Sequence, residues 1–414
     1  MTVDAPRTAI VIGNGVVGLN VALALQRRGT QVTMVAPDAP WRGASWGNAG
    51  HIAVEQVAPL ASLATVASIL GRLFSRGGAV ALPLGAIAAW LPFSLRLLGA
   101  ARPTRFRRGK AALAAMLATA IPAWQRVLED AGSPGLLRID GHFVVWETPK
   151  TAALGRAVWM AADIGTATVR DATPDELAQL ATLTDRPIAG AIRFLGSGQI
   201  TDTGALGEAL VARFVAAGGK VVHDLARSIV TREGHAHVTL TQGGPLDADV
   251  AVIAAGAASG ALAASAGMTA PLIAERGYHI EGDPGDWPAD QPPVVFEDRS
   301  MIVTRFADRL RAASIVEFAR TDTPPDPRKW DRLSSHVAAL GLPLHDPIEK
   351  WMGARPTLPD YLPAIGRRGP VAYAFGHQHL GLTLAATTGE ALAAELYGEA
   401  PAFDLSPFDL ARFG

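Results

Sequence analysis

The 414-residue sequence contains no cysteine. This absence excludes disulfides, thiolate metal ligands, iron–sulfur clusters, a cysteine nucleophile and any cofactor tethered through sulfur. It is compatible with a reducing compartment. The chain also lacks an excess of either charge: its formal net charge is −1, and it carries no zinc-finger or other nucleic-acid motif, so no nucleic-acid partner is expected. We therefore expect the partner to be a small molecule.

The N-terminus lacks the basic stretch, apolar core and small-residue cleavage site of a signal peptide, and a strand-like run from Thr8 to Ile12 begins almost at once. We therefore expect a cytoplasmic protein. Apolar residues make up 49% of the chain and charged residues 18%, which is typical of packed globular proteins. Because a single core rarely grows past ~250–300 residues, the length predicts two lobes with one cofactor between them.

The strongest motif lies near the N-terminus. The strand pattern Thr8 to Ile12 is followed by the glycine-rich stretch GNGVVG at 13–18 and then by the apolar run Leu19 to Leu25. Gly29 ends this run before a second strand-like segment, Val32 to Val35. Strand, glycine turn, helix and second strand in this order predict a dinucleotide-binding unit.

Each glycine of this motif has a physical role. Gly13 allows the tight turn, Gly15 lets the backbone approach a pyrophosphate, and Gly18 lets the helix pack on the strand. The free N–H groups of the helix N-terminus, at Val16 and Val17, favour an anion. An unrelated α/β unit with a glycine-rich turn is the alternative.

One usual feature of such a unit is missing. An acidic residue at the end of the second strand normally binds the adenosine ribose, but here Val35 is followed by Ala36 and Pro37. Asp38 either takes over this role from a later position or is a solvent-exposed turn residue.

Several later segments have the order and spacing of a known family. They are GASWGNAGH at 43–51, DADVAVIAAG at 247–256, WMGARPTLPD at 351–360 and GHQHLGLT at 376–383. Together with the glycine motif they resemble the D-amino acid dehydrogenases of the D-amino acid oxidase superfamily. The resemblance spans nearly the whole chain.

The resemblance implies FAD as the cofactor. It places beside FAD, in addition to the glycine motif, Ser45, Asn48, Ala49, Gly50, Gly256, Gly353, Gly381, Leu382 and Thr383. Gly381 also opens an apolar helical run toward Leu396, so free N–H groups at that end can face the flavin's pyrimidine oxygen. An ordinary capped C-terminal helix is the alternative. Without cysteine, we expect noncovalent FAD, although a histidyl link stays open.

The resemblance also implies that Arg355 binds the substrate carboxylate, for which guanidinium offers a planar fork. A structural salt bridge is the alternative. Tyr278 and His279 lie in a strand-like segment that either borders the substrate or belongs to the core. Three further histidines either orient substrate or flavin, accept a proton, or pack in the interior: His51, His377 and His379. None has persuasive metal-ligand spacing, so no metal site is expected.

The expected fold class is α/β, with two lobes: a Rossmann-like FAD-binding domain and a discontinuous mixed-sheet substrate domain of the D-amino acid oxidase type. We assign residues 1–55, 198–268 and 345–414 to the FAD-binding domain. Residues 56–197 and 269–344 form the expected substrate domain, which includes the strand-like segment Gly141 to Trp146.

The stretch 56–128 has no aspartate or glutamate. Its basic residues are Arg72, Arg76, Arg96, Arg102, Arg105, Arg107, Arg108, Lys110 and Arg126. Within it, Gly77 to Leu95 is 19 residues without charge, numerically long enough to span a bilayer, but glycines and prolines interrupt it. The stretch therefore either rests on anionic lipid at the inner membrane face or forms a solvated basic surface over a buried helix.

The leading hypothesis is FAD-dependent oxidation of the carbon–nitrogen bond of a small D-amino or cyclic imino acid, and the segment 376–383 slightly favours the D-hydroxyproline dehydrogenase branch. Hydride transfer to a flavin needs positioning more than acid–base catalysis, so no obligatory base is expected. The electron acceptor is a quinone, oxygen or a protein. Alternatives are the catalytic flavin subunit of an opine or sarcosine oxidase-like complex, and a non-catalytic flavin-bearing assembly or sensor subunit.

Overall fold

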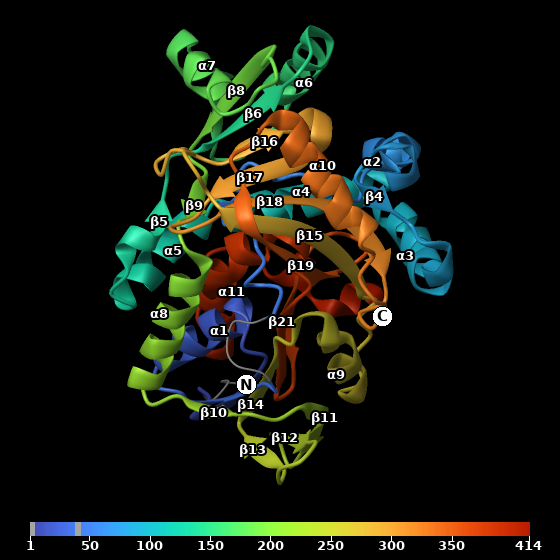
Figure 1. The fold of residues 1–414 in the computed structure, drawn as a ribbon. Coiled ribbons are helices and arrows are strands. Elements are labelled where there is room, and N and C mark those ends of the chain that lie inside the picture. Colours follow the sequence, from blue (N-terminus) through green and yellow to red (C-terminus); the bar gives the residue numbers. More distant parts are fainter. Residues whose placement is uncertain (1–4, 38–42) are drawn as a thin grey trace.

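The computed structural model describes residues 5–37 and 43–414, and Asp38 lies outside them. A six-stranded sheet forms the lower half of the molecule in Figure 1, in the order β10-β2-β1-β14-β21-β20. In that order the strands are Lys220–Val222, Gln31–Val35, Thr8–Ile12, Val250–Ile253, Val371–Phe375 and Ala364–Arg368. All neighbours are parallel except β20 and β21. The buried strands are almost wholly apolar, as parallel strands covered on both faces must be.

Helices pack against this sheet in one hydrophobic core. They are α1 (Val16–Gln26), α4 (Pro103–Leu117), α5 (Ala120–Asp130), α8 (Thr203–Ala216) and α11 (Gly381–Leu396). α1 and α11 cross so closely that a Cβ on Gly389 would lie 2.5 Å from the Asn20 carbonyl oxygen. The Trp124 indole of α5 donates to the Leu382 carbonyl at 2.9 Å, which fixes the start of α11.

A nine-stranded mixed sheet forms the upper half, in the order β19-β15-β18-β17-β16-β6-β8-β7, with β4 paired to β18. In that order the strands are His345–Thr357, Ile273–Asp283, Leu310–Ala319, Met301–Arg305, Val294–Phe296, His142–Trp146, Gly190–Leu195, Thr168–Asp171 and Val80–Ala81. Its long strands β15 and β19 run antiparallel to each other above the six-stranded sheet.

The remaining elements surround these two sheets. The helices are α2 (Leu63–Ser68), α3 (Ile87–Ala100), α6 (Pro149–Ala161), α7 (Pro174–Ala181), α9 (Ser259–Ser265) and α10 (Arg328–Leu340). One small sheet contains β3 (His51–Ile52), β9 (Gly198–Ile200) and β5 (Leu137–Arg138). Another contains β11 (Ala226–Arg232), β12 (His235–Leu240) and β13 (Leu246–Ala248).

The expected two-lobed α/β architecture is confirmed. The first strand and helix, the second strand and the strand at 142–146 all form where the sequence predicted them. The domain boundaries stay a proposal. Because β19 pairs with β15 in the nine-stranded sheet, we favour moving the last boundary from 345 to the end of β19.

The acid-free stretch folds as several short elements. Gly77 to Leu95 contains β4, a 3-10 turn and part of α3, with Pro92 inside that helix. A different described stretch, Pro103–Asp130, is long and apolar enough to cross a membrane by length and composition alone. It consists of α4 and α5, whose buried residues Met116, Leu117 and Trp124 pack in the interior with α11, as in the core helices of a globular domain.

Candidate active site

The glycine turn 13–18 joins β1 to α1 at distances that only glycine permits. Gly13 has a φ of +115° and donates its N–H to the Val35 carbonyl at 2.9 Å. A Cβ on Gly13 would lie 2.3 Å from the Ala254 carbonyl oxygen, and one on Gly18 would lie 2.0 Å from the Gly13 carbonyl oxygen. The backbones of β1, α1 and β14 therefore come together at this turn without intervening side chains, as the dinucleotide motif requires.

A cavity of about 1230 Å³ extends from this turn to Arg355. Small-molecule sites usually measure about 300–1,000 Å³, so the cavity has room for a dinucleotide and a small substrate together. Of the predicted cofactor residues, those that line it are Gly13, Gly15, Val16, Val17, Ser45, Asn48, Ala49, Gly256, Gly353, Gly381 and Leu382. The glycine turn, at which the backbone is free of side chains, therefore fits FAD.

Two further predicted cofactor residues, Thr383 and Gly50, position the chain segments that line the cavity. Thr383 accepts a hydrogen bond from the Ala53 N–H at 3.0 Å, which ties the start of α11 to the segment after the flavin-side loop. Gly50 has a φ of +77° and packs against the Phe306 ring, where a Cβ would come within 2.8 Å. Both residues hold the chain that lines the cavity rather than lining it themselves.

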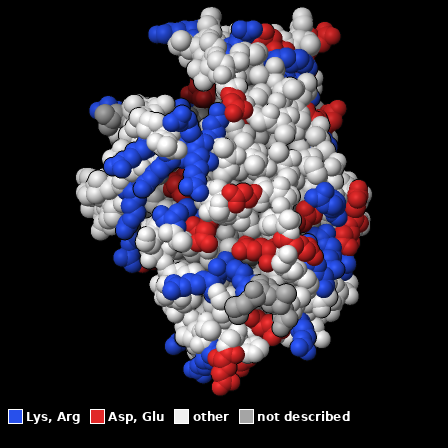
Figure 2. Space-filling view, turned by 180° about the vertical axis from the view of Figure 1, so that it is seen from behind, with Lys and Arg blue, Asp and Glu red and all other residues white. Residues whose placement is uncertain are grey.

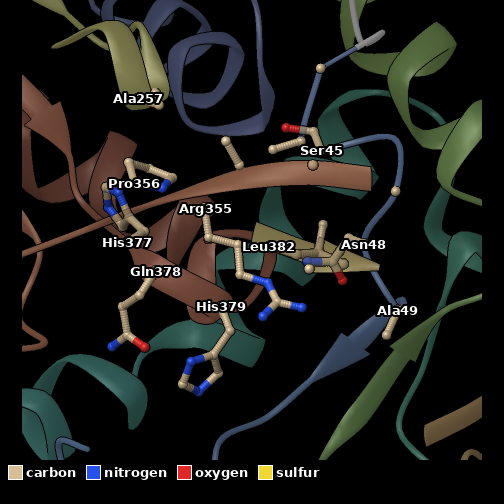
Figure 3. A pocket seen from close by; sticks show the side chains of 18 of the residues that line it. Ser45, Asn48, Ala49, Ala257, Arg355, Pro356, His377, Gln378, His379 and Leu382 are labelled. Carbon is tan, nitrogen blue, oxygen red and sulfur yellow. The ribbon is translucent and has the colours of Figure 1, made fainter. Parts of the chain in front are cut away.

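The predicted flavin-side loop, residues 43–50, borders this cavity in Figure 3, where Ser45, Asn48 and Ala49 are labelled. The Ser45 hydroxyl accepts a hydrogen bond from the Val16 N–H at 2.9 Å, which joins the loop to the start of α1. Asn48 accepts one from the Gly50 N–H at 2.9 Å. The loop is therefore held beside the dinucleotide motif.

A buried arginine of β18 holds this loop in place through its backbone carbonyls. Arg311 is fully buried and donates to the carbonyls of Trp46, at 3.0 Å, and Asn48. Its charge is balanced by Glu281, whose carboxylate lies 2.6 Å away. Burial lowers the pKa of Arg311 to about 10, which leaves it charged at neutral pH. The backbone carbonyls of the loop are thus turned toward Arg311.

His279 and Trp351 support the same loop. The His279 ring stacks on Trp351, with centroids 4.9 Å apart, and its Nδ1 lies 3.2 Å from the Gly47 carbonyl oxygen. Trp351 packs so closely on Gly47 and Gly353 that a Cβ on either would lie within 2.2 Å of the indole. Burial lowers the pKa of His279, so this ring is neutral.

Arg355 faces the cavity from β19. Its Nη1 donates to Glu275 at 3.3 Å, while its other N–H groups have no partner among the described residues. Glu275 is buried and also accepts hydrogen bonds from the hydroxyls of Thr357 and Tyr361, each at 3.2 Å. The guanidinium lies over Gly277, where a Cβ would come within 2.3 Å of it. One carboxylate therefore orients Arg355 and leaves much of its donor fork open.

His379 lines the same cavity as Arg355 (Figure 3). Its Nε2 lies 2.6 Å from Gln56 Oε1, and burial lowers its pKa to about 4. His377 instead lies 2.9 Å from the Thr388 hydroxyl of α11, and burial lowers its pKa to about 3. Both rings are neutral at physiological pH. The contact with Thr388 favours the packing role for His377.

Tyr278 and His51 complete the predicted set. Tyr278 is buried, and its hydroxyl donates to Glu317 at 2.6 Å, beneath Trp330 of α10. This contact favours the core alternative for Tyr278. His51 lines the cavity, and its Nε2 lies 3.1 Å from Glu55.

Comparison with known proteins agrees with this geometry. Residues 8–395 match the family described as "DAO: FAD dependent oxidoreductase". The chain belongs to this family. FAD is therefore its cofactor, and the DAO-family resemblance stated from the sequence is confirmed.

Relatives of this DAO-family chain match it over nearly its full length. A "D-amino-acid oxidase" of Bradyrhizobium diazoefficiens is 31% identical, over 98% of this chain and 99% of the relative. A "D-amino acid dehydrogenase 2" of Pseudomonas aeruginosa is 30% identical, over 95% and 96%. The solved glycine oxidase of Geobacillus kaustophilus has a TM-score of 0.73 at 22% identity, with 98% of each chain covered, and shares the fold.

Sequence reasoning missed several residues of the DAO-family site. Trp351 lies in the segment 351–360 that carried the resemblance, but the sequence did not indicate that its ring stacks on His279. Glu275 and Gln56 contact the predicted residues Arg355 and His379 only through the tertiary fold, and Tyr361 in turn contacts Glu275. A buried glutamate paired with Arg355 gives no local sequence signal, because an isolated glutamate in a strand-like segment is usually interpreted as a surface residue.

We predict that FAD is bound noncovalently, because the chain has no cysteine and each described histidine that lines the cavity already contacts a protein oxygen through one ring nitrogen. These histidines are His51, His142, His279, His377 and His379. Acid precipitation of the purified protein should leave the yellow colour in the supernatant. Colour that stays in the washed pellet would show a covalent histidyl link instead.

Proposed function

We propose that this chain oxidises the carbon–nitrogen bond of a D-amino or cyclic imino acid, such as D-proline or hydroxy-D-proline, with FAD as the hydride acceptor. The observation that carries this proposal is the open guanidinium fork of Arg355 in the cavity that begins at the glycine turn. Relatives named D-amino-acid oxidase and D-amino acid dehydrogenase support the substrate class.

Arg355 and Glu275 have separate roles in this proposal, one in substrate binding and one in orientation. Arg355 binds the substrate carboxylate through paired charged hydrogen bonds, and Glu275 holds the guanidinium in place. His379 is neutral, so it adds no second positive charge, and recognition of the carboxylate rests on Arg355. Bound FAD supplies the electrophile that accepts a hydride from the substrate α-carbon. No general base is required of the protein, because hydride transfer to bound FAD depends on positioning more than on acid–base catalysis.

Turnover with a panel of D- and L-amino acids, cyclic imino acids and N-carboxyalkyl amino acids tests the substrate class. An artificial electron-accepting dye replaces the natural acceptor. We expect D-amino acids to release ammonia and the corresponding oxo acid, while a cyclic imino acid gives a cyclic imine without ammonia. Turnover of N-carboxyalkyl amino acids alone would favour the opine oxidase-like alternative, and no turnover at all would favour the non-catalytic one.

We further propose that the acid-free stretch places the enzyme on the inner membrane face and that a quinone accepts its electrons. Large apolar side chains are exposed along one side of α3 and the turn before it: Leu84, Ile87, Leu91, Leu95 and Leu98. Their spacing of three and four residues aligns them on one helical face. Figure 2 shows basic side chains gathered in a band on the side where Figure 1 places α2 and α3. Apolar contact and basic charge together favour an anionic lipid surface.

We predict that the protein floats with anionic liposomes at low salt, and less at high salt, because salt screens the basic side chains. The double variant Leu84→Asp/Leu95→Asp should lose binding that persists at high salt, since both side chains are exposed and make little core contact. Leu154→Asp/Val158→Asp, on exposed α6, is the matched control. If wild-type protein stays unbound and oxygen reoxidises its flavin faster than a quinone analogue does, the proposal is wrong.

A further inference from the structure

Three side chains from two separate parts of the chain meet on the cavity wall. His51 and Glu55 follow the flavin-side loop, and His142 begins β6. Each offers one ligand atom, and these atoms all lie within 4.8 Å of one another. His51 Nε2 lies 3.1 Å from Glu55 Oε1, and the rings of His51 and His142 meet edge to face with centroids 4.5 Å apart.

The cluster is buried and its polar atoms are incompletely paired. Glu55 and His142 are 3% and 4% exposed. Among the described residues, Glu55 Oε2 and His51 Nδ1 have no hydrogen-bond partner. A buried carboxylate oxygen without a partner is costly, because it has lost its water and gained nothing in exchange. A cation bound to the Glu55 carboxylate would lower that cost.

The surroundings of His142 are those of an oriented ligand. Its Nδ1 lies 3.0 Å from the hydroxyl of the fully buried Ser197, and its ring stacks on Phe194 of β8 at a centroid distance of 4.5 Å. These contacts fix the ring and leave Nε2 as the nitrogen available to a ligand. Histidines that bind metals usually have their other nitrogen held in this way.

We propose that His51, Glu55 and His142 bind a divalent transition-metal ion of the Zn²⁺ class. Two imidazoles and one carboxylate are a common zinc ligand set, and three protein ligands leave a fourth position open to the cavity. Tetrahedral donors at about 2.0–2.2 Å from zinc stand roughly 3.3 Å apart. The His51–Glu55 pair already has this spacing, and the ligand atom of His142 lies within 4.8 Å of both.

The test is zinc binding to the FAD-loaded protein, prepared without a polyhistidine tag and freed of metal by a chelator. Equilibrium dialysis with metal analysis should give one Zn²⁺ per chain for the wild type. Glu55→Gln and His142→Phe should each weaken binding at least about 100-fold, and Ser197→Ala, which removes only the orienting hydroxyl, about 10–100-fold. His237→Gln, which breaks a surface pair between His237 and Asp247, is the matched control and should bind as the wild type does.

X-ray absorption spectroscopy of the zinc-loaded wild type identifies the ligands directly. It does not depend on whether any variant folds. It should show two imidazole nitrogens and at least one oxygen. The proposal is overturned if the FAD-loaded wild type binds no stoichiometric zinc, if the spectrum lacks two imidazoles, or if Glu55→Gln and His142→Phe retain FAD and bind zinc normally. The cluster would then be only a hydrogen-bonded pair beside a packed histidine.

Discussion

Replacement of Arg355 by alanine is expected to lower kcat/KM roughly 10- to 150-fold, because a lost charged hydrogen-bond pair costs about 1.5–3 kcal/mol. Most of the loss should appear as a higher KM, since a guanidinium that binds the carboxylate would do so in both the ground state and the transition state. Lysine at this position should recover little, because it lacks the planar fork. Steady-state kinetics with the best amino acid, beside the FAD content of each variant, measures this effect.

Two variants separate carboxylate binding from a structural salt bridge. Arg368→Ala removes an arginine of β20 that donates to the Gly267 carbonyl and does not line the cavity, so kinetics should stay normal. Glu275→Gln keeps the shape beside Arg355 but weakens its orientation, so KM should rise less than in Arg355→Ala. Near-normal saturation of Arg355→Ala with FAD retained would show that Arg355 is not the carboxylate ligand.

Gly15→Ala is expected to yield folded protein that has lost most of its FAD. Gly15 has an extended backbone with φ −74°, and its added Cβ would meet only the Ser45 hydroxyl, at 3.2 Å, so the fold should tolerate it. The methyl group would instead occupy the place where the backbone approaches the pyrophosphate. Overpacking of this kind costs about 1–3 kcal/mol, so FAD affinity should fall roughly 5- to 150-fold.

The FAD-to-protein ratio after extensive dialysis, together with far-ultraviolet circular dichroism, measures this loss. Gly244→Ala is the matched control, because a Cβ there would have nothing within 4 Å and the residue does not line the cavity. Gly13→Ala should destabilise the fold more than Gly15→Ala does, since its Cβ would clash with the Ala254 carbonyl. A Gly15→Ala protein that keeps its full FAD content would place the pyrophosphate elsewhere.

Local patterns predicted the dinucleotide unit because all of its parts lie within about one strand, turn and helix. The steric need for glycine at 13 and 18 arises from neighbours in the same unit and from the returning strand β14. Arg355 was identified through the family resemblance, and its orientation by Glu275 was not. That contact depends on the pairing of β15 with β19, which no local pattern specifies.

The side chains of β15 show what a strand pattern in the sequence cannot predict. Successive side chains of a strand point to opposite faces, so period alone cannot tell which set faces a cavity. The Glu275 and His279 side chains contact Arg355 and the flavin-side loop, whereas the Tyr278 side chain contacts Glu317 and Trp330. The cluster of His51, Glu55 and His142 could not be predicted for a related reason, because β6 and the segment after the flavin-side loop meet only in the folded chain.

Anaerobic reduction of the bound FAD by amino acids tests the proposed function most directly, because it needs neither the natural acceptor nor a partner chain. We expect a D-amino or cyclic imino acid to bleach the oxidised-flavin absorbance, its L-enantiomer to do so much more slowly, and the Arg355→Ala protein to require far higher concentrations. An FAD-loaded wild-type protein whose flavin stays oxidised with every D-amino and cyclic imino acid would contradict the account.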